Sequence, residues 1–312
     1  MTASEYVHGP DDGPLHERIS TLPEGSVLKL DAGQYRGPIA LINDITIEAA
    51  GDVGSVVITS TGGPTVRMEG ASNVILRRLV LKGPTRGFGA VIAAWNPAQT
   101  RIEDCLLNAG RGEGEGGGAI DIQAGRIAIV RCRVTESAAL QGGAVRVAGP
   151  ALVEASSSVF SENVAEGQGG GAIFANRGGT ALLEGCTFDG NRGDHGSALL
   201  AARGGTGGTI RAKNCLFGSR QEGLAVAVHE GGTLSLRHCA IAAMAESVSE
   251  GVQVDATVVE KSVPLRREPP RYRPEFPTQL RDLGCPSDNE DAALDVYGQP
   301  RGSLAVGAVG DL

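Results

Sequence analysis

Apolar and polar residues alternate in short runs that recur along the chain. Around Cys132, for example, Ile127 and Ile129 precede a two-residue break, and the alternation resumes at Val134. Alternation on both sides of a break is typical of two short strands that meet at a corner and send every second side chain inward. The same frame surrounds a series of positions 24 to 29 residues apart: Leu79, Cys105, Cys132, Ser158, Cys186, Cys215 and Cys239.

A third alternating run precedes each of these pairs. The runs are Gly118–Ile122, Gly143–Val147, Gly171–Ala175, Ser197–Ala201 and Leu224–Val228. The repeats lack the 3.6-residue period of helical repeats, and three strands in about two dozen residues are typical of one coil of a parallel β-helix. We therefore predict an all-β, single-domain, right-handed parallel β-helix of about eight to nine coils, which tolerates length changes at one corner of each coil.

The pattern divides the chain into three parts. Residues 1–24 form an N-terminal arm and cap, in which Leu15, Ile19 and Leu22 share one face of a short helix over the first coil. The β-helix covers residues 25–263. Residues 264–312 begin with a segment rich in proline and arginine, which cannot continue the sheets because proline lacks the amide donor. We expect this segment to be a strap or linker and the rest to dock on the solenoid.

Composition narrows the function and the compartment. The net charge of −8 disfavours nucleic acid, which needs a basic stripe. No run of 18 apolar residues suggests a membrane span, and the start of the chain does not resemble a secretory signal, so a cytoplasmic protein is expected. Reduced thiols are consistent with a cytoplasmic location. We expect the cysteine ladder to be small core residues rather than disulfides, and Cys285 to be a free thiol.

Short motifs link these repeats to known families. Gly-Gly-Ala-Ile at residues 117–120 and 170–173, with Phe-x-x-Asn at 160–163 and 188–191, resembles the repeats of polymorphic outer-membrane adhesins. The whole pattern resembles the pectin-lyase-like right-handed β-helix superfamily, and residues 22–41 resemble the opening coil of its carbohydrate-processing members. The resemblance implies that substrates lie along the outer face of the first strand, walled by variable loops. One scaffold of this kind hosts lyases, hydrolases, epimerases and adhesins, so the resemblance predicts fold better than function.

Parity selects the side chains on that outer face. One row is expected to contain Arg67, Ile92, Asp121, Arg146, Phe174, Leu200 and Ala227, and its neighbour Glu69, Ala94, Gln123, Ala148, Asn176, Ala202 and His229. Trp95 follows the strand at Ile92 and could stack on a sugar ring. The expected substrate-binding residues are therefore Arg67, Gln123, Asn176, Trp95 and Phe174.

A polysaccharide lyase would need a base and a cationic group that neutralises the uronate carboxylate. Arg146 or His195 is the candidate base, and Asp121 or loop acids could hold a cation such as calcium. The loop acids are Glu113, Glu115, Glu166 and Asp194. No other cofactor and no dedicated metal cluster is expected. A glycoside hydrolase needs two carboxylates around one bond, and only Asp121 among the outward residues of the middle coils is acidic, so the lyase is preferred.

Each candidate also has a structural interpretation. An outward Asp121 beside Arg146 is typical of a cross-strand salt bridge. Phe174 and Leu200 make the face partly apolar, which suits a packed loop or a protein partner. His195 could be a solvated loop residue. We therefore carry two functions: binding or lyase-type processing of an extended polysaccharide, and a non-catalytic scaffold for a protein partner or for self-assembly into a homo-oligomer.

Overall fold

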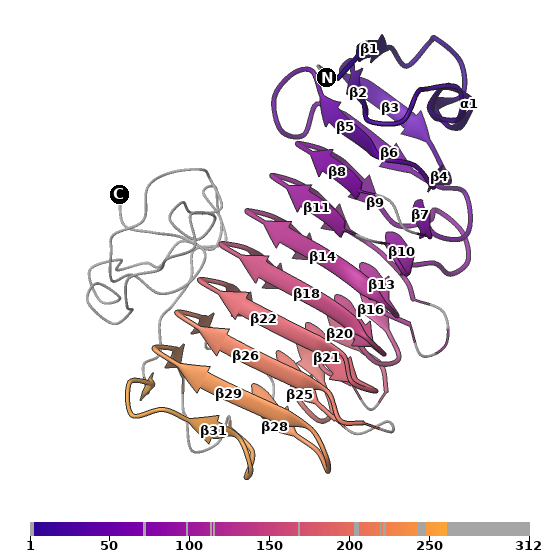
Figure 1. The fold of residues 1–312 in the computed structure, drawn as a ribbon. Helices are drawn as coiled ribbons and strands as arrows, with labels where there is room; N and C mark the ends of the chain where they lie inside the picture. Colours follow the sequence, from indigo (N-terminus) through magenta and orange to yellow (C-terminus); the bar gives the residue numbers. More distant parts are fainter. Residues whose placement is uncertain are drawn as a thin grey trace.

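The structure is a computed structural model, which describes residues 3–260 except 71–72, 98, 113, 115, 168, 203–205, 219, 221–222 and 243–247. The described chain winds into a solenoid of parallel strands whose coils stack from the N-terminal end downward (Figure 1). Its strands form three long sheets of eleven, eight and ten strands, which we call sheets A, C and B. The eight strands of sheet C agree with the predicted number of coils, and the all-β solenoid is confirmed.

Sheet A contains the strand that precedes each cysteine corner. Its members, in spatial order, are β1 (Glu5–His8), β2 (Ser26–Leu30), β5 (Ile45–Ala49), β8 (Asn73–Arg77), β11 (Gln99–Glu103), β14 (Gly125–Val130), β18 (Ala151–Ser156), β22 (Thr180–Glu184), β26 (Thr209–Lys213), β29 (Thr233–Arg237) and β31 (Gln253–Val254). Sheet A thus begins with β1, a strand within the N-terminal arm that pairs in parallel with β2.

Sheets B and C complete each coil. Sheet B contains β3 (Gly33–Arg36), β6 (Val56–Thr59), β9 (Val80–Lys82), β12 (Leu106–Asn108), β15 (Arg133–Thr135), β19 (Val159–Ser161), β23 (Thr187–Asp189), β27 (Leu216–Phe217), β30 (Ala240–Ile241) and β32 (Val259–Glu260). Sheet C contains β4 (Ile39–Leu41), β7 (Val66–Glu69), β10 (Ile92–Trp95), β13 (Ile120–Ile122), β17 (Val145–Ala148), β21 (Ile173–Asn176), β25 (Leu199–Ala201) and β28 (Val226–Val228). A small fourth sheet contains β16 (Ala138–Ala139), β20 (Val164–Ala165) and β24 (Arg192–Gly193).

The corner between sheets A and B explains the ladder. The residue before each ladder position has a positive φ, as at Asp104 (53°), Arg131 (50°) and Asn214 (55°), which turns the chain within one residue. The next side chain then points into the core, where the described cysteines are buried and free of disulfides. The amide N–H of Cys132 donates to Ser158 Oγ at 3.0 Å, so the serine satisfies a corner amide. The prediction of stacked, unbridged thiols is confirmed for these five positions.

The Phe-x-x-Asn motif builds two further stacks beside sheet B. The rings of Phe160 and Phe188 lie parallel with centroids 5.2 Å apart, and Phe217 continues the stack at 5.1 Å. Three residues further along, the Asn163 N–H donates to Asn191 Oδ1 at 3.1 Å, and Asn191 Nδ2 donates to the carbonyl of Phe160 at 2.9 Å. Buried asparagines thereby pair backbone groups that the corner leaves unpaired.

The N-terminal end carries the predicted cap. Helix α1 (Leu15–Ser20) buries Leu15 and packs Ile19 against the core, and it contacts β4. The expected strap and docking segment at residues 264–312 lies outside the described residues. Within the described part of the chain, no helix is long and apolar enough to cross a membrane.

Candidate functional site

The first candidate surface is the outer face of sheet C, where the sequence places the substrate. Strand register confirms that Asp121 lies beside Arg146, Arg146 beside Phe174, and Phe174 beside Leu200. The position assigned to Ile92 is wrong: Ile92 pairs with Val66 and Ile120 and is fully buried in the core. Ala93 takes the outward place, between Arg67 and Asp121.

The neighbouring row needs the same correction. Trp95 pairs with Glu69 and therefore belongs to this row, whereas Ala94 pairs with Met68 and lies in the core. Further along, Ala148 and Asn176 are register partners, as predicted. In the corrected row Trp95 on β10 is the register partner of Glu69 on β7, and Gln123 directly follows β13, the strand on the other side of β10.

The face of sheet C divides into a covered and an open half. In the covered half, Arg146 is 4% exposed, Phe174 is 3% exposed and Asn176 is also buried. A small apolar cluster separate from the main core contains Phe174, Leu200, Ala202 and Ala227, with Leu224 against it. The predicted partly apolar face is therefore packed rather than exposed.

The Gly-Gly-Ala-Ile motif shows how the bend before sheet C folds back on its own strand. A Cβ at Gly117 would lie 2.1 Å from the carbonyl oxygen of Ile120, and one at Gly170 would lie 2.2 Å from that of Ile173. Only glycine fits such a close approach, so the bend lies tightly over the first residues of each strand. The motif is explained by this packing.

The open half lies over β7, β10 and β13. Arg67, Glu69 and Gln123 are exposed, and Trp95 keeps 37% of its surface accessible. Gln123 Nε2 donates to Asp121 Oδ2 at 3.4 Å. This part of the face combines one broad aromatic ring with several hydrogen-bonding side chains.

Of the three predicted catalytic residues, only Arg146 and Asp121 come together. Arg146 Nη1 lies 3.2 Å from Asp121 Oδ1 in a largely buried ion pair. His195 lies in the loop that leads into β25, two strands beyond the strand of Arg146 in sheet C, and its ring contacts that of His229 with centroids 4.6 Å apart. Burial, followed by the neighbouring His195, lowers the pKa of His229.

The predicted loop acids are only partly described. Glu166 and Asp194 are exposed, and Glu113 and Glu115 lie outside the described residues. In the part of the chain that the structure describes, no three His, Cys, Asp or Glu side chains gather closely enough to hold a metal ion.

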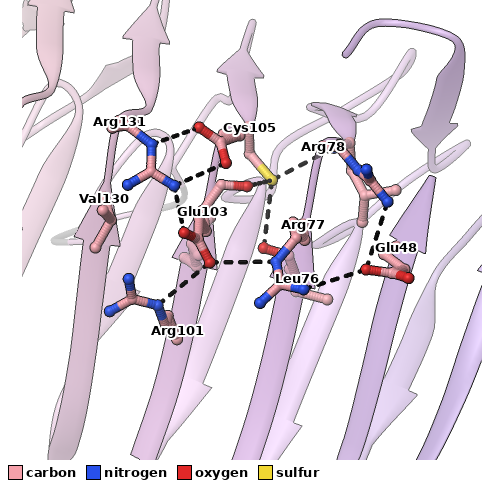
Figure 2. A network of polar contacts seen from close by, with 12 residues as sticks. Glu48, Leu76, Arg77, Arg78, Arg101, Glu103, Cys105, Val130 and Arg131 are labelled. Carbon is pink, nitrogen blue, oxygen red and sulfur yellow. Dashed lines mark hydrogen bonds and ion pairs between the residues drawn. The ribbon is translucent and has the colours of Figure 1, made fainter. Parts of the chain in front are cut away.

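A second polar region lies on the outer face of sheet A, which the sequence reasoning did not single out. The Glu103 carboxylate accepts hydrogen bonds from Arg77 Nε at 3.2 Å and from Arg101 Nε at 3.4 Å, and it also forms an ion pair with Arg131 (Figure 2). Arg77 also forms an ion pair with Glu48, in which Arg77 Nη1 and Glu48 Oε2 are 3.3 Å apart. Burial acts to raise the pKa of Glu103, but the hydrogen bonds from Arg101 and Arg131 outweigh it, so its pKa lies below the ordinary value.

A groove of about 550 Å³ runs across sheet A beside this network. It is lined by Gln99, Arg101, Arg126, Ala128, Val130, Glu154, Ala155, Ser156, Leu182, Leu183, Glu184, Arg211, Ala212, Lys213, Ser235 and Arg237. Five of these side chains are cationic and two are acidic, although the whole chain is acidic. Basic residues at outward positions of consecutive strands were the available signal in the sequence.

The comparison with protein families agrees with this architecture. The family model described as "Right handed beta helix region" matches residues 90–257. A search of solved structures finds pectate lyase Pel9A, 12% identical, with a TM-score of 0.48 over 100% of this chain and 97% of that one. It also finds a mutant of the alginate lyase AlyGC, 14% identical, with a TM-score of 0.44 over 81% of this chain.

The chain spans 40% of the length of that alginate lyase. None of the curated proteins matches the sequence. The family match covers more than half of the chain and includes most of the cysteine ladder. The chain therefore belongs to the right-handed β-helix family.

Proposed function

We propose that the protein binds an extended polysaccharide along the open half of sheet C. The observation that carries this proposal is the exposed indole of Trp95 within a row of hydrogen-bonding side chains. An amphipathic aromatic ring can cover the apolar face of a sugar while its neighbours bond the hydroxyl groups. Arg67 and Glu69 on β7 and Gln123 directly after β13 supply donors and acceptors beside it.

Binding fits this surface better than cleavage. Proton abstraction requires a base within hydrogen-bond reach of the substrate. Arg146 is buried and ion-paired with Asp121, and His195 lies in the loop before β25, which is two strands beyond the strand of Arg146 in sheet C. The geometry therefore supports recognition of a polymer without a lyase step at this face.

The single tryptophan of the chain makes a direct test available. Titration with uronate and neutral polysaccharides should change the fluorescence of Trp95 for the polymer that binds. In calorimetry, Trp95→Ala should weaken that binding about tenfold, since one aromatic contact contributes about 1 kcal/mol or slightly more. Val53→Ala, at another exposed apolar residue, is the control. Unchanged affinity of Trp95→Ala would remove the proposal.

A lyase assay tests the absence of cleavage. Uronate polymers incubated with the protein should not gain the ultraviolet absorbance of an unsaturated product. If they do, and Arg146→Ala abolishes the gain, the site is catalytic and the binding-only proposal is wrong.

End-to-end association is a second candidate function, favoured by β1. This strand is the terminal member of sheet A, so one backbone edge lacks a partner strand within the described residues, and Val7 on it is exposed. Free edges invite pairing with another copy. Light scattering should then show a mass that grows with concentration, and Val7→Pro should abolish the growth by removing one edge donor.

A further inference from the structure

The C-terminal half of the outer face of sheet A carries three cations on two neighbouring strands. Arg211 and Lys213 lie on β26, and Arg237 lies on β29. Lys213 and Arg237 are register partners, so their Cα atoms are about one strand spacing apart, ~4.8 Å. Like charges at such positions destabilise a sheet unless another charge neutralises them.

Few carboxylates face this cluster. Lys213 Nζ lies 3.3 Å from Glu184 Oε1 on β22, and Asp255 lies close enough to Arg237 to feel its charge without an ion pair between them. Arg211 and Arg237 are exposed, and neither forms an ion pair with any described residue. Among the residues that the structure describes, these two guanidinium groups therefore have no carboxylate partner.

Hydroxyl groups border the arginines. Thr180, Thr209 and Thr233 occupy one row on consecutive strands, and Ser235 is the register partner of Arg211. These side chains alternate with the buried core positions of their strands, so they face outward together with the cations. A ligand that bears both acidic and hydroxyl groups would find partners for both.

The groove gives the ligand its shape. It crosses the strands from β11 to β29, and between the charged ends its lining includes small residues such as Ala128 and Ser156. No aromatic side chain lines it among the described residues, whereas sequence-tolerant binding of single-stranded nucleic acid relies on aromatic stacking. A linear, carboxylate-bearing chain is a better fit than a nucleic acid.

We propose that this groove is a second site, which binds an acidic polysaccharide through Arg211 and Arg237. Guanidinium groups form bidentate, charge-assisted hydrogen bonds with carboxylates, and Lys213 adds a further positive charge. The choice of a polysaccharide rests on the proposed function, but the residues, the sheet and the required charge are separate from those of the open half of sheet C.

The test compares two double variants by calorimetry with polygalacturonate at low salt. Arg211→Gln/Arg237→Gln should lower the affinity about a hundredfold, about tenfold for each charged contact. Arg36→Gln/Arg192→Gln removes the same charge from exposed arginines on β3 and β24 and should leave the affinity unchanged. The wild-type affinity should also fall as salt rises, because exposed charges are screened.

The outcomes separate the two proposals. If Trp95→Ala lowers the affinity and the groove variant does not, the groove inference is overturned and the proposed function stands. If only the groove variant loses affinity, the open half of sheet C is not a binding site and the groove inference holds. Equal or tighter binding of single-stranded DNA, lost in the groove variant, would overturn the assignment to a polysaccharide.

Discussion

One row of outward positions on sheet A carries its charges in two different arrangements. At the N-terminal end the signs alternate from strand to strand, through Lys29, Glu48, Arg77 and Glu103. At the C-terminal end Glu184 precedes two cations, Lys213 and Arg237, without a carboxylate between them. The same backbone supports both arrangements, so the difference lies in the side chains alone.

The alternating end neutralises itself. Each of its arginines has at least one carboxylate partner, and the corner residues join the network because Arg78 pairs with Glu48 at 3.5 Å and Arg131 pairs with Asp104 at 2.8 Å. Glu103 is the hub, with a side chain that is only 12% exposed (Figure 2). Such a network stabilises the stack of coils, whereas at the C-terminal end Arg211 and Arg237 form no ion pair with a described residue.

Loss of the Glu103 carboxylate should have the largest effect on the free energy of unfolding. Glu103→Gln leaves Arg77, Arg101 and Arg131 half-buried beside a neutral amide, and should lower the free energy of unfolding by about 2 kcal/mol. Denaturant unfolding would measure the change. The control variant Glu184→Gln, at the C-terminal end of the row, should lower the free energy of unfolding by less than about 0.5 kcal/mol. Equal losses would show that the two ends do not differ.

Low pH should reduce the difference in stability between the wild type and Glu103→Gln. The pKa of Glu103 is lower in the folded protein than its ordinary 4.5, despite burial, because arginines donate to it. A lowered folded pKa stabilises the fold fully above the unfolded value, and the stabilisation is lost as the pH falls through the folded value. The stability gap between wild type and Glu103→Gln should therefore be constant near pH 7 and shrink below pH 4.5. A gap that widens in acid would contradict the proposed charge state.

The smallest effect is expected from restoring alternation at the other end. Arg237→Glu places a carboxylate beside Lys213 and should raise the free energy of unfolding by about 0.5 kcal/mol. Thermal unfolding at low salt would detect it, with Arg237→Gln as the neutral control. Arg237→Glu should also weaken the binding of the acidic polysaccharide. A stability loss would mean that Arg237 has a structural partner.

The repeat itself could be read from the sequence. Cys132, Cys186 and Cys215 mark a corner whose geometry recurs because each coil packs on an almost identical neighbour. The glycines of Gly-Gly-Ala-Ile and the asparagines of Phe-x-x-Asn likewise occupy positions where the backbone permits little else. Local constraints of this kind leave a strong pattern in the chain.

Register was harder where the pattern weakens. Residues 90–94 read Ala-Val-Ile-Ala-Ala, an apolar run with no polar residue to mark its outer face. A shift of one residue exchanges the two faces of a strand, so Ile92 was assigned outward although it lies in the core and Ala93 faces outward. Trp95 was singled out as a candidate from the sequence, but its row followed only from the structure.

The candidate sites depend on contacts between distant parts of the chain. Burial of Phe174 results from packing in a separate cluster with Leu200 and Ala227, and the sequence offers no measure of that packing. The exposed cations Arg211 and Arg237 become a cluster only when β26 and β29 are aligned. Resemblance to a known family pointed to the face of sheet C, whereas the groove on sheet A could be found only from the register of its strands.

The buried thiols have a practical consequence for following how this solenoid comes apart. Cys105, Cys132, Cys186, Cys215 and Cys239 each sit in a different turn, and burial raises the pKa of those at 132 and 215, so a thiol reagent finds no thiolate there until that turn opens. Modules that touch only their neighbours can fray from either end. The order in which these sulfurs are alkylated would therefore record the route of unravelling, turn by turn, with labels that the chain already contains.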